Sequence, residues 1–185
     1  GAITGNFKLT AAALDVTSYY DLFTAAKPGA TNVAPAKTTA TTSANPDEEP
    51  AAVKLPLKNF VIDLNIGHLF LREVDIANWQ TTVLLDGGHV LVKPCQLTLN
   101  DAPVKATVDL DLGVPGYTYD VAFNANAIPL TPLVDSFAPD RKGQIAGSTS
   151  ANAHVKGAGI TGTNLQKNLA GQFDFATTNM NLSIA

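Results

Sequence analysis

The chain has 185 residues, of which 45% are hydrophobic and only 15% are charged, and its formal net charge is −4 at pH 7. The basic residues are scattered, with no cluster longer than Arg141-Lys142, which argues against a nucleic-acid partner because phosphate binding needs a concentrated basic surface. The single cysteine, Cys95, excludes an internal disulfide. No apolar run reaches the roughly 18 residues that a transmembrane helix needs.

The first part of the chain predicts a strand, a helix and a linker. Residues 3–14 have the pattern of a strand, and residues 18–26 predict a short helix capped by Thr17 or Ser18. Residues 27–54 are rich in Ala, Thr, Pro and Ser and contain no Leu, Ile, Phe, Tyr, Trp or Met. Such a segment cannot bury enough surface to offset the entropy lost on ordering. We therefore divide the chain into 1–26 (first strand and helix), a flexible linker at 27–54, and a β domain at 55–185.

Alternation of apolar and polar residues is the main signal of the β domain. In the segment 104–112, the even-numbered residues are apolar and Lys105, Thr107, Asp109 and Asp111 are polar, so one side of this strand is dry and the other is wet. The same alternation recurs elsewhere, and strands of this kind build a one-faced antiparallel sheet. The candidate residues of its apolar face are Phe60, Ile62, Leu64, Leu97, Leu99, Val104, Val108, Leu110, Leu112, Val121 and Phe123.

Turn signals recur every 8 to 12 residues, as is typical of an all-β meander. The turns are predicted at 86–88, 100–103 and 113–116, where Gly, Asn, Asp and Pro gather. The fold class is therefore mainly β, with an antiparallel sheet and two or three short helices. The predicted strands are 58–67, 68–72, 74–85, 89–99, 104–112, 117–128, 143–156 and 171–184, and the later helices are 129–137 and 164–170.

The motifs that carry chemistry elsewhere are weak in this chain. Gly157, Gly159 and Gly162 match G-x-G-x-x-G, but the helix that follows has room for only about two turns and no second βαβ unit follows, so turn glycines explain them better. His68, His89 and His154 lack the spacing of metal ligands.

Asp109 and Asp111 share a strand face at roughly 7 Å, as paired glycosidase carboxylates can, but any solvated strand gives the same spacing. Cys95 has no base beside it in the sequence and is explained as a small apolar residue. We expect no enzyme activity, no cofactor and no metal site. A hydrolase with an unrecognised site is kept as one alternative.

The order of several short segments is also informative. They are Gly5-Asn-Phe-Lys-Leu-Thr, Leu14-Asp-Val before a helix, Leu55-Pro-Leu-Lys and Ile62-Asp-Leu-Asn-Ile-Gly-His-Leu after the low-complexity insert, Leu85-Asp-Gly-Gly-His-Val-Leu-Val-Lys-Pro, Gly143-Gln-Ile-Ala-Gly147, Val155-Lys-Gly157, and Asn168-Leu-Ala-Gly171-Gln-Phe-Asp-Phe-Ala. In order and spacing they resemble the C-terminal region of AsmA-like proteins of the bacterial envelope, relatives of the TamB group. The shared positions are small, apolar or glycine, so no catalytic residue is carried over.

The resemblance implies a curved, groove-like or taco-like sheet with an apolar inner surface. It also implies a periplasmic location, a parent protein anchored in the inner membrane, and a role in outer-membrane biogenesis and phospholipid transport. Gly1 in first position is typical of a cleaved tag, so we expect a piece of a longer protein. The leading hypothesis is a non-enzymatic groove that binds phospholipid acyl chains, with other envelope proteins as further partners. The alternative is an interaction module that has a closed core under its helices and pairs through an edge strand.

Overall fold

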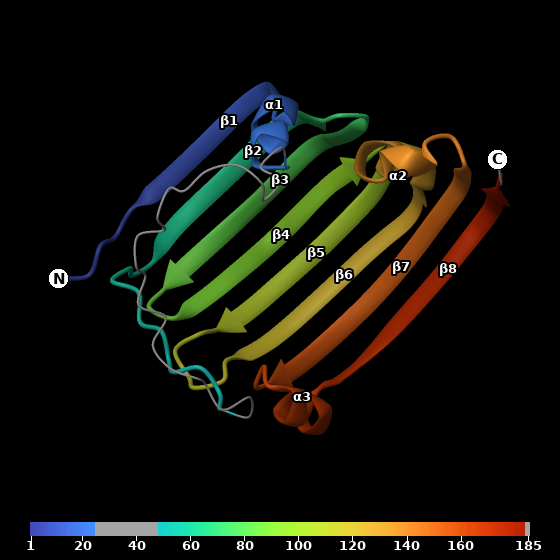
Figure 1. Ribbon diagram of the computed structural model, residues 1–185. Helices are drawn as coiled ribbons and strands as arrows, with labels where there is room; N and C mark the ends of the chain where they lie inside the picture. The colour runs from blue at the N-terminus through green and yellow to red at the C-terminus, as the bar shows by residue number, and fades with distance from the viewer. Residues whose placement is uncertain (25–47, 184–185) are drawn as a thin grey trace, which may run out of the picture.

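The structure is a computed structural model that describes residues 1–24 and 48–183. It confirms the mainly β fold: eight strands form one open sheet in the order β1 to β8, with short helices at the strand ends (Figure 1). The elements are β1 (Asn6–Asp15), α1 (Thr17–Thr24), β2 (Phe60–Leu71), β3 (Val74–Asp86), β4 (His89–Leu99), β5 (Ala102–Asp111), β6 (Thr118–Pro129), α2 (Leu130–Phe137), the 3-10 turn η1 (Pro139–Arg141), β7 (Ile145–Ala158), α3 (Gly162–Asn168) and β8 (Ala170–Leu182).

The sheet is mixed rather than purely antiparallel. Strands β2 to β8 form an antiparallel meander, but β1 lies parallel to β2, with Asn6 opposite Val61 and Leu9 opposite Leu64. A parallel pair needs a connection that returns along the whole strand. Residues 16–59 connect β1 to β2, and their composition gives no sign of the direction of the next strand.

The β-turns follow the predicted chemistry, with one correction. Asn100 and Asp101 have φ values of 48° and 69°, as a two-residue type I′ hairpin turn requires. The separate strands predicted at 58–67 and 68–72 are wrong, because β2 continues through Gly67. A Cβ on Gly67 would lie 2.4 Å from the backbone oxygen of Ala12, so this glycine permits the close approach of β1.

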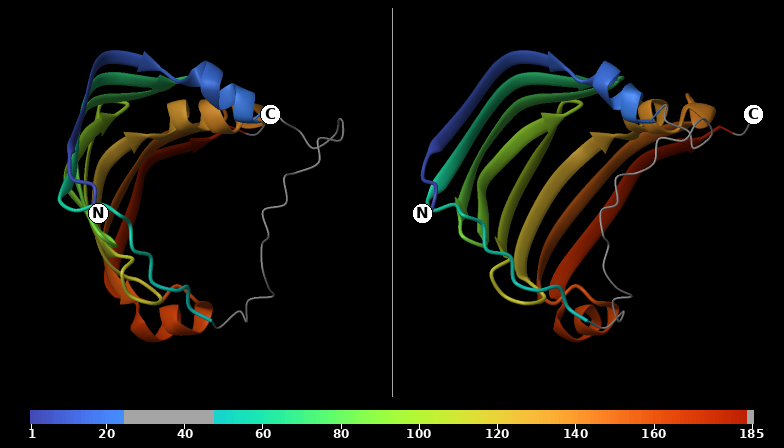
Figure 2. Two further views of the ribbon diagram at one scale, coloured as in Figure 1. Left: turned by 90° about the vertical axis from the view of Figure 1, so that its left-hand side faces the viewer. Right: turned by 60° about the vertical axis from the view of Figure 1, so that its left-hand side comes forward.

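Every strand bends in the same sense, so the sheet has a concave and a convex side (Figure 2). Helices α1 and α2 lie at one end of the strands, called here the upper end as in Figure 1, and α3 lies at the lower end. Helix α2 covers the upper part of the concave side, where Leu133 packs on the cluster of Ala102, Val104, Ala125 and Ile128.

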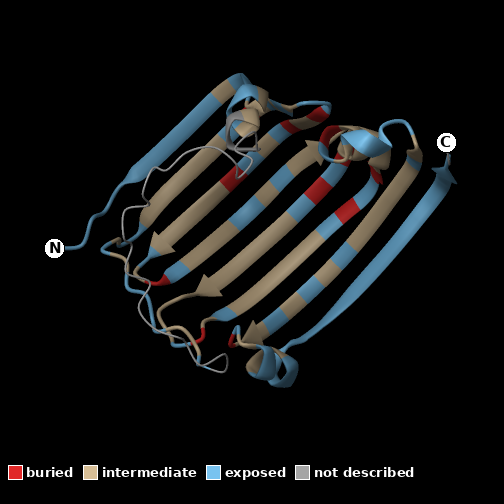
Figure 3. Ribbon diagram, in the orientation of Figure 1, coloured by how far each residue is buried: buried red, intermediate tan, exposed pale blue. Residues whose placement is uncertain are grey.

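The buried core is small for a sheet of this size. Among the described residues, the buried hydrophobic side chains are Ile66, Val74, Ala77, Ala102, Val104, Ala125 and Ile128. Most other sheet residues are half-buried or exposed (Figure 3). A closed core under both predicted helices is therefore wrong, because cover is confined to the upper end.

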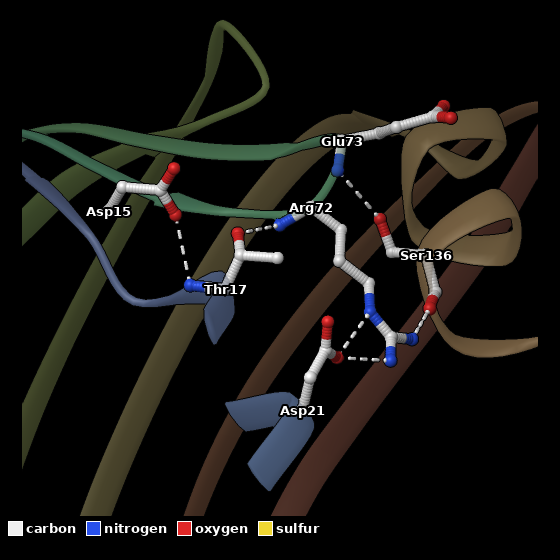
Figure 4. Close-up of polar contacts among 6 residues, drawn as sticks. All are labelled: Asp15, Thr17, Asp21, Arg72, Glu73 and Ser136. Atoms are coloured by element: carbon white, nitrogen blue, oxygen red, sulfur yellow. Dashed lines mark hydrogen bonds and ion pairs between the residues drawn. The ribbon is translucent and has the colours of Figure 1, made fainter. Parts of the chain in front are cut away.

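The β2–β3 turn joins the two upper helices (Figure 4). The Arg72 guanidinium donates to Asp21 Oδ1 of α1 through Nη2 at 2.6 Å and to the carbonyl oxygen of Ser136 in α2. The buried Ser136 hydroxyl accepts from the Glu73 amide at 3.1 Å. The predicted cap of α1 needs correction, because the carboxylate of Asp15, not Thr17 or Ser18, accepts the amide hydrogen of Thr17.

The lower end of the sheet is bordered by residues 48–58, called here the strap. Its backbone bonds the connections between strands: the Pro50 oxygen accepts from the Gly116 amide at 2.9 Å, and the Val53 amide donates to the Leu112 oxygen at 2.7 Å. Residues 27–47 of the predicted linker lie outside the described residues, so the linker stays a prediction. Its last residues, 48–54, belong to the strap.

Candidate functional site: the concave apolar face

The register between strands arranges apolar side chains in rows that cross the sheet. Two rows extend over all eight strands and one extends from β2 to β7. The valine row consists of Phe7, Ile62, Val83, Val92, Val108, Val121, Val155 and Gly171. The Phe123 row consists of Leu9, Leu64, Thr81, Cys95, Ala106, Phe123, Ala153 and Phe173. The Leu110 row consists of Phe60, Leu85, Val90, Leu110, Tyr119 and Gly157.

These rows lie on the concave side. Leu97, Val104 and Ala125 are opposite one another on β4, β5 and β6, two residues from Cys95, Ala106 and Phe123, and therefore share their face. Leu97 and Val104 belong to the cluster that α2 covers from the concave side. We call the three rows together the concave apolar face, and none of its residues is charged.

The structure brings most of the predicted lining residues together. Seven of them fall in the three rows, three lie under or beside α2, and Leu112 lies just beyond β5, bonded to Gly88 and Val53. Only Val104, at 8% exposure, is buried, and the others are half-buried. The face is thus open to solvent below α2. The residues in the rows are Phe60, Ile62, Leu64, Val108, Leu110, Val121 and Phe123, and those near α2 are Leu97, Leu99 and Val104.

The sequence analysis missed part of this face because of a β-bulge. Val92 is opposite Val108, and Cys95 is opposite Ala106, so two residues of β4, Lys93 and Pro94, face one residue of β5, Thr107. Strict alternation puts Val92 and Cys95 on opposite sides, whereas the bulge at Lys93 and Pro94 puts them on the same side. Pro94, which cannot donate to the ladder, was the available signal. The other residues of the three rows that the candidate list lacks are Phe7, Leu9, Thr81, Val83, Leu85, Val90, Ala106, Tyr119, Ala153, Val155, Gly157, Gly171 and Phe173.

The convex side is polar across the middle of the sheet. A row of hydrophilic residues crosses all eight strands on this side: Thr10, Asn65, Gln80, Gln96, Lys105, Asn124, Asn152 and Asp174. A hollow of about 330 Å³ is lined by Cys95, Ala106, Phe123 and Ala153 of the Phe123 row and by their chain neighbours on both sides, which include Gln96, Lys105 and His154. None of the concave residues that flank this row lines the hollow, so it belongs to the convex side. The convex side is a solvated surface, as the alternation predicted.

The histidines pair singly with aspartates. His89 Nε2 lies 2.6 Å from Asp109 Oδ1, and His154 Nε2 lies 2.7 Å from Asp120 Oδ1. The bond from His154, followed by that from Lys156, lowers the pKa of Asp120. His68 lies 3.1 Å from Asp75. Within residues 1–24 and 48–183, no group of three or more His, Cys, Asp or Glu is placed to hold a metal ion.

The glycine-rich segment binds a carboxylate of the chain itself. Glu49 in the strap accepts hydrogen bonds from the amides of Ile160 and Thr161 at 2.9 and 3.1 Å, from Thr161 Oγ1 at 2.7 Å and from Asn164 Nδ2 at 2.7 Å. These bonds, led by the one from the Ile160 amide, lower the pKa of Glu49 from 4.5 to about 2. Gly159 has a φ of 84°, which favours glycine. The motif is therefore a turn that anchors the strap.

Comparison with known proteins gives one match. No curated protein and no solved structure matches the chain at a significant level. None of the helices in the described part of the chain is long and apolar enough to cross a membrane. The model of the AsmA family matches residues 5–183, nearly the whole chain. The chain therefore belongs to the AsmA family, which is associated with the bacterial envelope and with outer-membrane assembly.

Proposed function

We propose that this chain is a non-enzymatic module of the bacterial envelope that binds phospholipid acyl chains on its concave apolar face. The observation that carries the proposal is the valine row, which crosses eight strands without a polar side chain and is open to solvent below α2. Covering its exposed apolar surface with another apolar group removes that surface from water and lowers the free energy. Family membership supports a periplasmic location, with a parent protein anchored in the inner membrane.

The dimensions of the rows suit an acyl chain. Strands lie about 4.8 Å apart, so seven steps from β1 to β8 give a row of about 34 Å. The hydrocarbon core of a bilayer is about 30 Å thick, so one leaflet contributes about 15 Å. An acyl chain can therefore lie across the strands along one row, with the neighbouring rows on either side.

The energetics need no specific polar contact. Burying one methylene group contributes about 0.8 kcal/mol, so a chain of about 14 methylenes that loses half of its water contact gains about 5–6 kcal/mol. This gain depends on an uncharged surface and not on a particular side chain. We therefore expect binding to be broad with respect to the lipid headgroup.

A matched pair of variants tests the proposal. Val108 points to the concave side from the middle of β5, and its neighbour Thr107 points to the convex side. Val108→Asp places a charge in the valine row, whereas Thr107→Asp places the same charge in the same strand on the polar side. We expect phospholipid to copurify with the wild type and with Thr107→Asp, and to be lost from Val108→Asp, as measured by native mass spectrometry.

Circular dichroism spectra and thermal unfolding establish that both variants are folded. Equal lipid content in the two folded variants contradicts binding on the concave face. A wild type that carries no lipid after gentle purification, and takes up none from vesicles of phosphatidylethanolamine and phosphatidylglycerol, contradicts the proposal as a whole.

Cys95 offers a second measurement because it is the only thiol and lies half-buried in the Phe123 row. Bound acyl chains should slow its reaction with a maleimide. The double variant Cys95→Ala, Gln96→Cys moves the thiol to the convex side, where lipid should leave the rate unchanged. Equal effects of lipid at both positions contradict chain binding along this row.

A further inference from the structure

The two edge strands expose apolar side chains. Phe173 and Phe175 of β8 are 67% and 61% exposed, and Phe7 and Leu9 of β1 are 50% and 37% exposed. All 13 residues of β8 are exposed, and no described strand pairs with the outer edge of β1 or β8. An open edge presents unpaired N–H and C=O groups that can pair with another strand. Both edges therefore have the chemistry of a strand-pairing interface.

The directions of β1 and β8 allow the two edges to meet in a head-to-tail arrangement. β1 is parallel to β2, and the six antiparallel pairings from β2 to β8 make β8 parallel to β2 again. The two edge strands therefore point the same way (Figure 1). If a second copy lies beyond β8 in the same orientation, its β1 is parallel to β8 of the first copy. This is the same parallel pairing that β1 and β2 form within one copy.

We propose that copies of this chain associate through β8 of one copy and β1 of the next, so that the concave apolar face continues across the junction. One register joins the rows: Gly171 meets the second copy's Phe7, Phe173 meets its Leu9, and Phe175 meets its Ala11. Large side chains then face small ones in two of these three pairs. The stacked rings of Phe173 and Phe175 lose solvent contact at this junction.

The charges of the two strands are compatible with this register. Asp174 is the only charged residue of β8, whereas β1 carries Lys8 and Asp15. The second copy's Lys8 lies beside Gln172, one diagonal step from Asp174 on the convex side and about 7–8 Å away, within reach of a lysine side chain. Asp15 falls beside Asn179, so no like charges meet.

Pairing of β8 with β8 about a two-fold axis fits less well. If two copies of β8 pair antiparallel over the full length of the strand, Asn179 of one copy lies opposite Phe173 of the other. Asn179 has a φ of 52° and lies at an irregularity in the register between β7 and β8. A left-handed residue interrupts the regular hydrogen bonds of a new ladder. In the head-to-tail register, this position meets only the end of β1.

Sedimentation velocity of the purified chain without lipid tests the proposal. We expect the average mass of the wild type to rise with concentration without a fixed endpoint, because a head-to-tail interface does not close. Leu9→Lys and Phe173→Lys each remove one side of the interface and should weaken self-association by at least about tenfold. An equimolar mixture of the two variants keeps one intact interface and should form a heterodimer and nothing larger.

Asn124→Lys, on the convex side of β6 and two strands away from β8, is the control and should associate like the wild type. If a lysine in the apolar rows disturbs folding, substitutions at the exposed residues Lys8 and Asp174 replace these variants. The single variant Lys8→Asp should weaken association, and the double variant with Lys8→Asp and Asp174→Lys should restore it. A wild type that stays monomeric at the highest soluble concentration overturns the proposal and leaves the edges to strands of other proteins. Persistent dimers of Leu9→Lys overturn it in favour of β8–β8 pairing. Lipid binding by a monomer leaves the proposed function intact.

Discussion

Thr81→Val should stabilise the protein, although it removes a hydroxyl group from the middle of the sheet. Thr81 is 6% exposed, and its Oγ1 has no hydrogen-bond partner among the described residues. A buried hydroxyl without a partner costs about 1–3 kcal/mol of desolvation, and valine has the same branched shape and suits a strand as well. We expect a gain of about 1 kcal/mol, equivalent to a rise of about 2–4 °C in Tm for a chain of this size.

The neighbouring Thr82→Val is the matched control. Thr82 Oγ1 donates to Asp63 Oδ1 at 2.7 Å on the convex side, so the same substitution breaks a hydrogen bond and should destabilise the protein by about 0.5–1.5 kcal/mol. Urea unfolding should give midpoints shifted in opposite directions with an unchanged slope. A loss of stability in Thr81→Val similar to that in Thr82→Val refutes the reasoning and means that the Thr81 hydroxyl has a partner in solution, such as a buried water.

Two further predictions concern the contacts at the ends of the strands. The low pKa of Glu49 means that its bonds to Ile160, Thr161 and Asn164 stabilise the fold fully above pH 4.5 and lose this effect as the pH falls towards 2. Hydrogen exchange of the Ile160 amide, corrected for intrinsic rates, should therefore accelerate in that window in the wild type but be fast and independent of pH in Glu49→Gln. Arg72→Ala removes the hydrogen bonds to α1 and α2 and should lower the free energy of unfolding by about 1 kcal/mol. Amide hydrogen exchange should become faster in both helices, whereas Arg141→Ala, at an exposed position, should have little effect.

The alternation of side chains was sufficient to predict the class of fold and one side of the sheet. It works for β5 and β6 because Val104 to Leu110 and Tyr119 to Ala125 pair without interruption. In such strands the side-chain period is two, and each residue has only one possible face. The helix predicted at 129–137 was found at 130–137, because its apolar stripe lies between turn signals. The helix predicted at 164–170 lies at 162–168, where Leu165 is the only large apolar residue and the sequence pattern does not fix the bounds.

The long-range features were not predictable for identifiable reasons. The parallel β1–β2 pair depends on a crossover of which the larger part, residues 27–54, has no apolar pattern. The role of Glu49 depends on residues more than 100 positions away in sequence, and one glutamate in a low-complexity segment carries no signal of its partner. The open state of the face depends on how far a single eight-residue helix, α2, extends over the sheet.

Bulges explain how the rows stay continuous although the strands are irregular. Ala125 and Ile128 are three residues apart, yet they are opposite Ala151 and Thr149, which share a face, so the bulge near Ala127 returns Ile128 to the concave side. The bulge at Lys93 and Pro94 does the same for Val92 and Cys95. Without these insertions, part of each strand would present its apolar residues to the convex side.

An apolar face made in this way constrains the sequence differently from an active site. Each position in a row needs a side chain that is uncharged and of suitable size, and Val, Ile, Leu, Phe and Ala all occur. Conservative exchanges among them alter packing modestly on a half-buried face. A charge, or a one-residue slip in register, interrupts the row at any position. What the proposed function requires is therefore the phase of the apolar–polar alternation, which is set by the turns, the bulges and the glycines where strands approach closely.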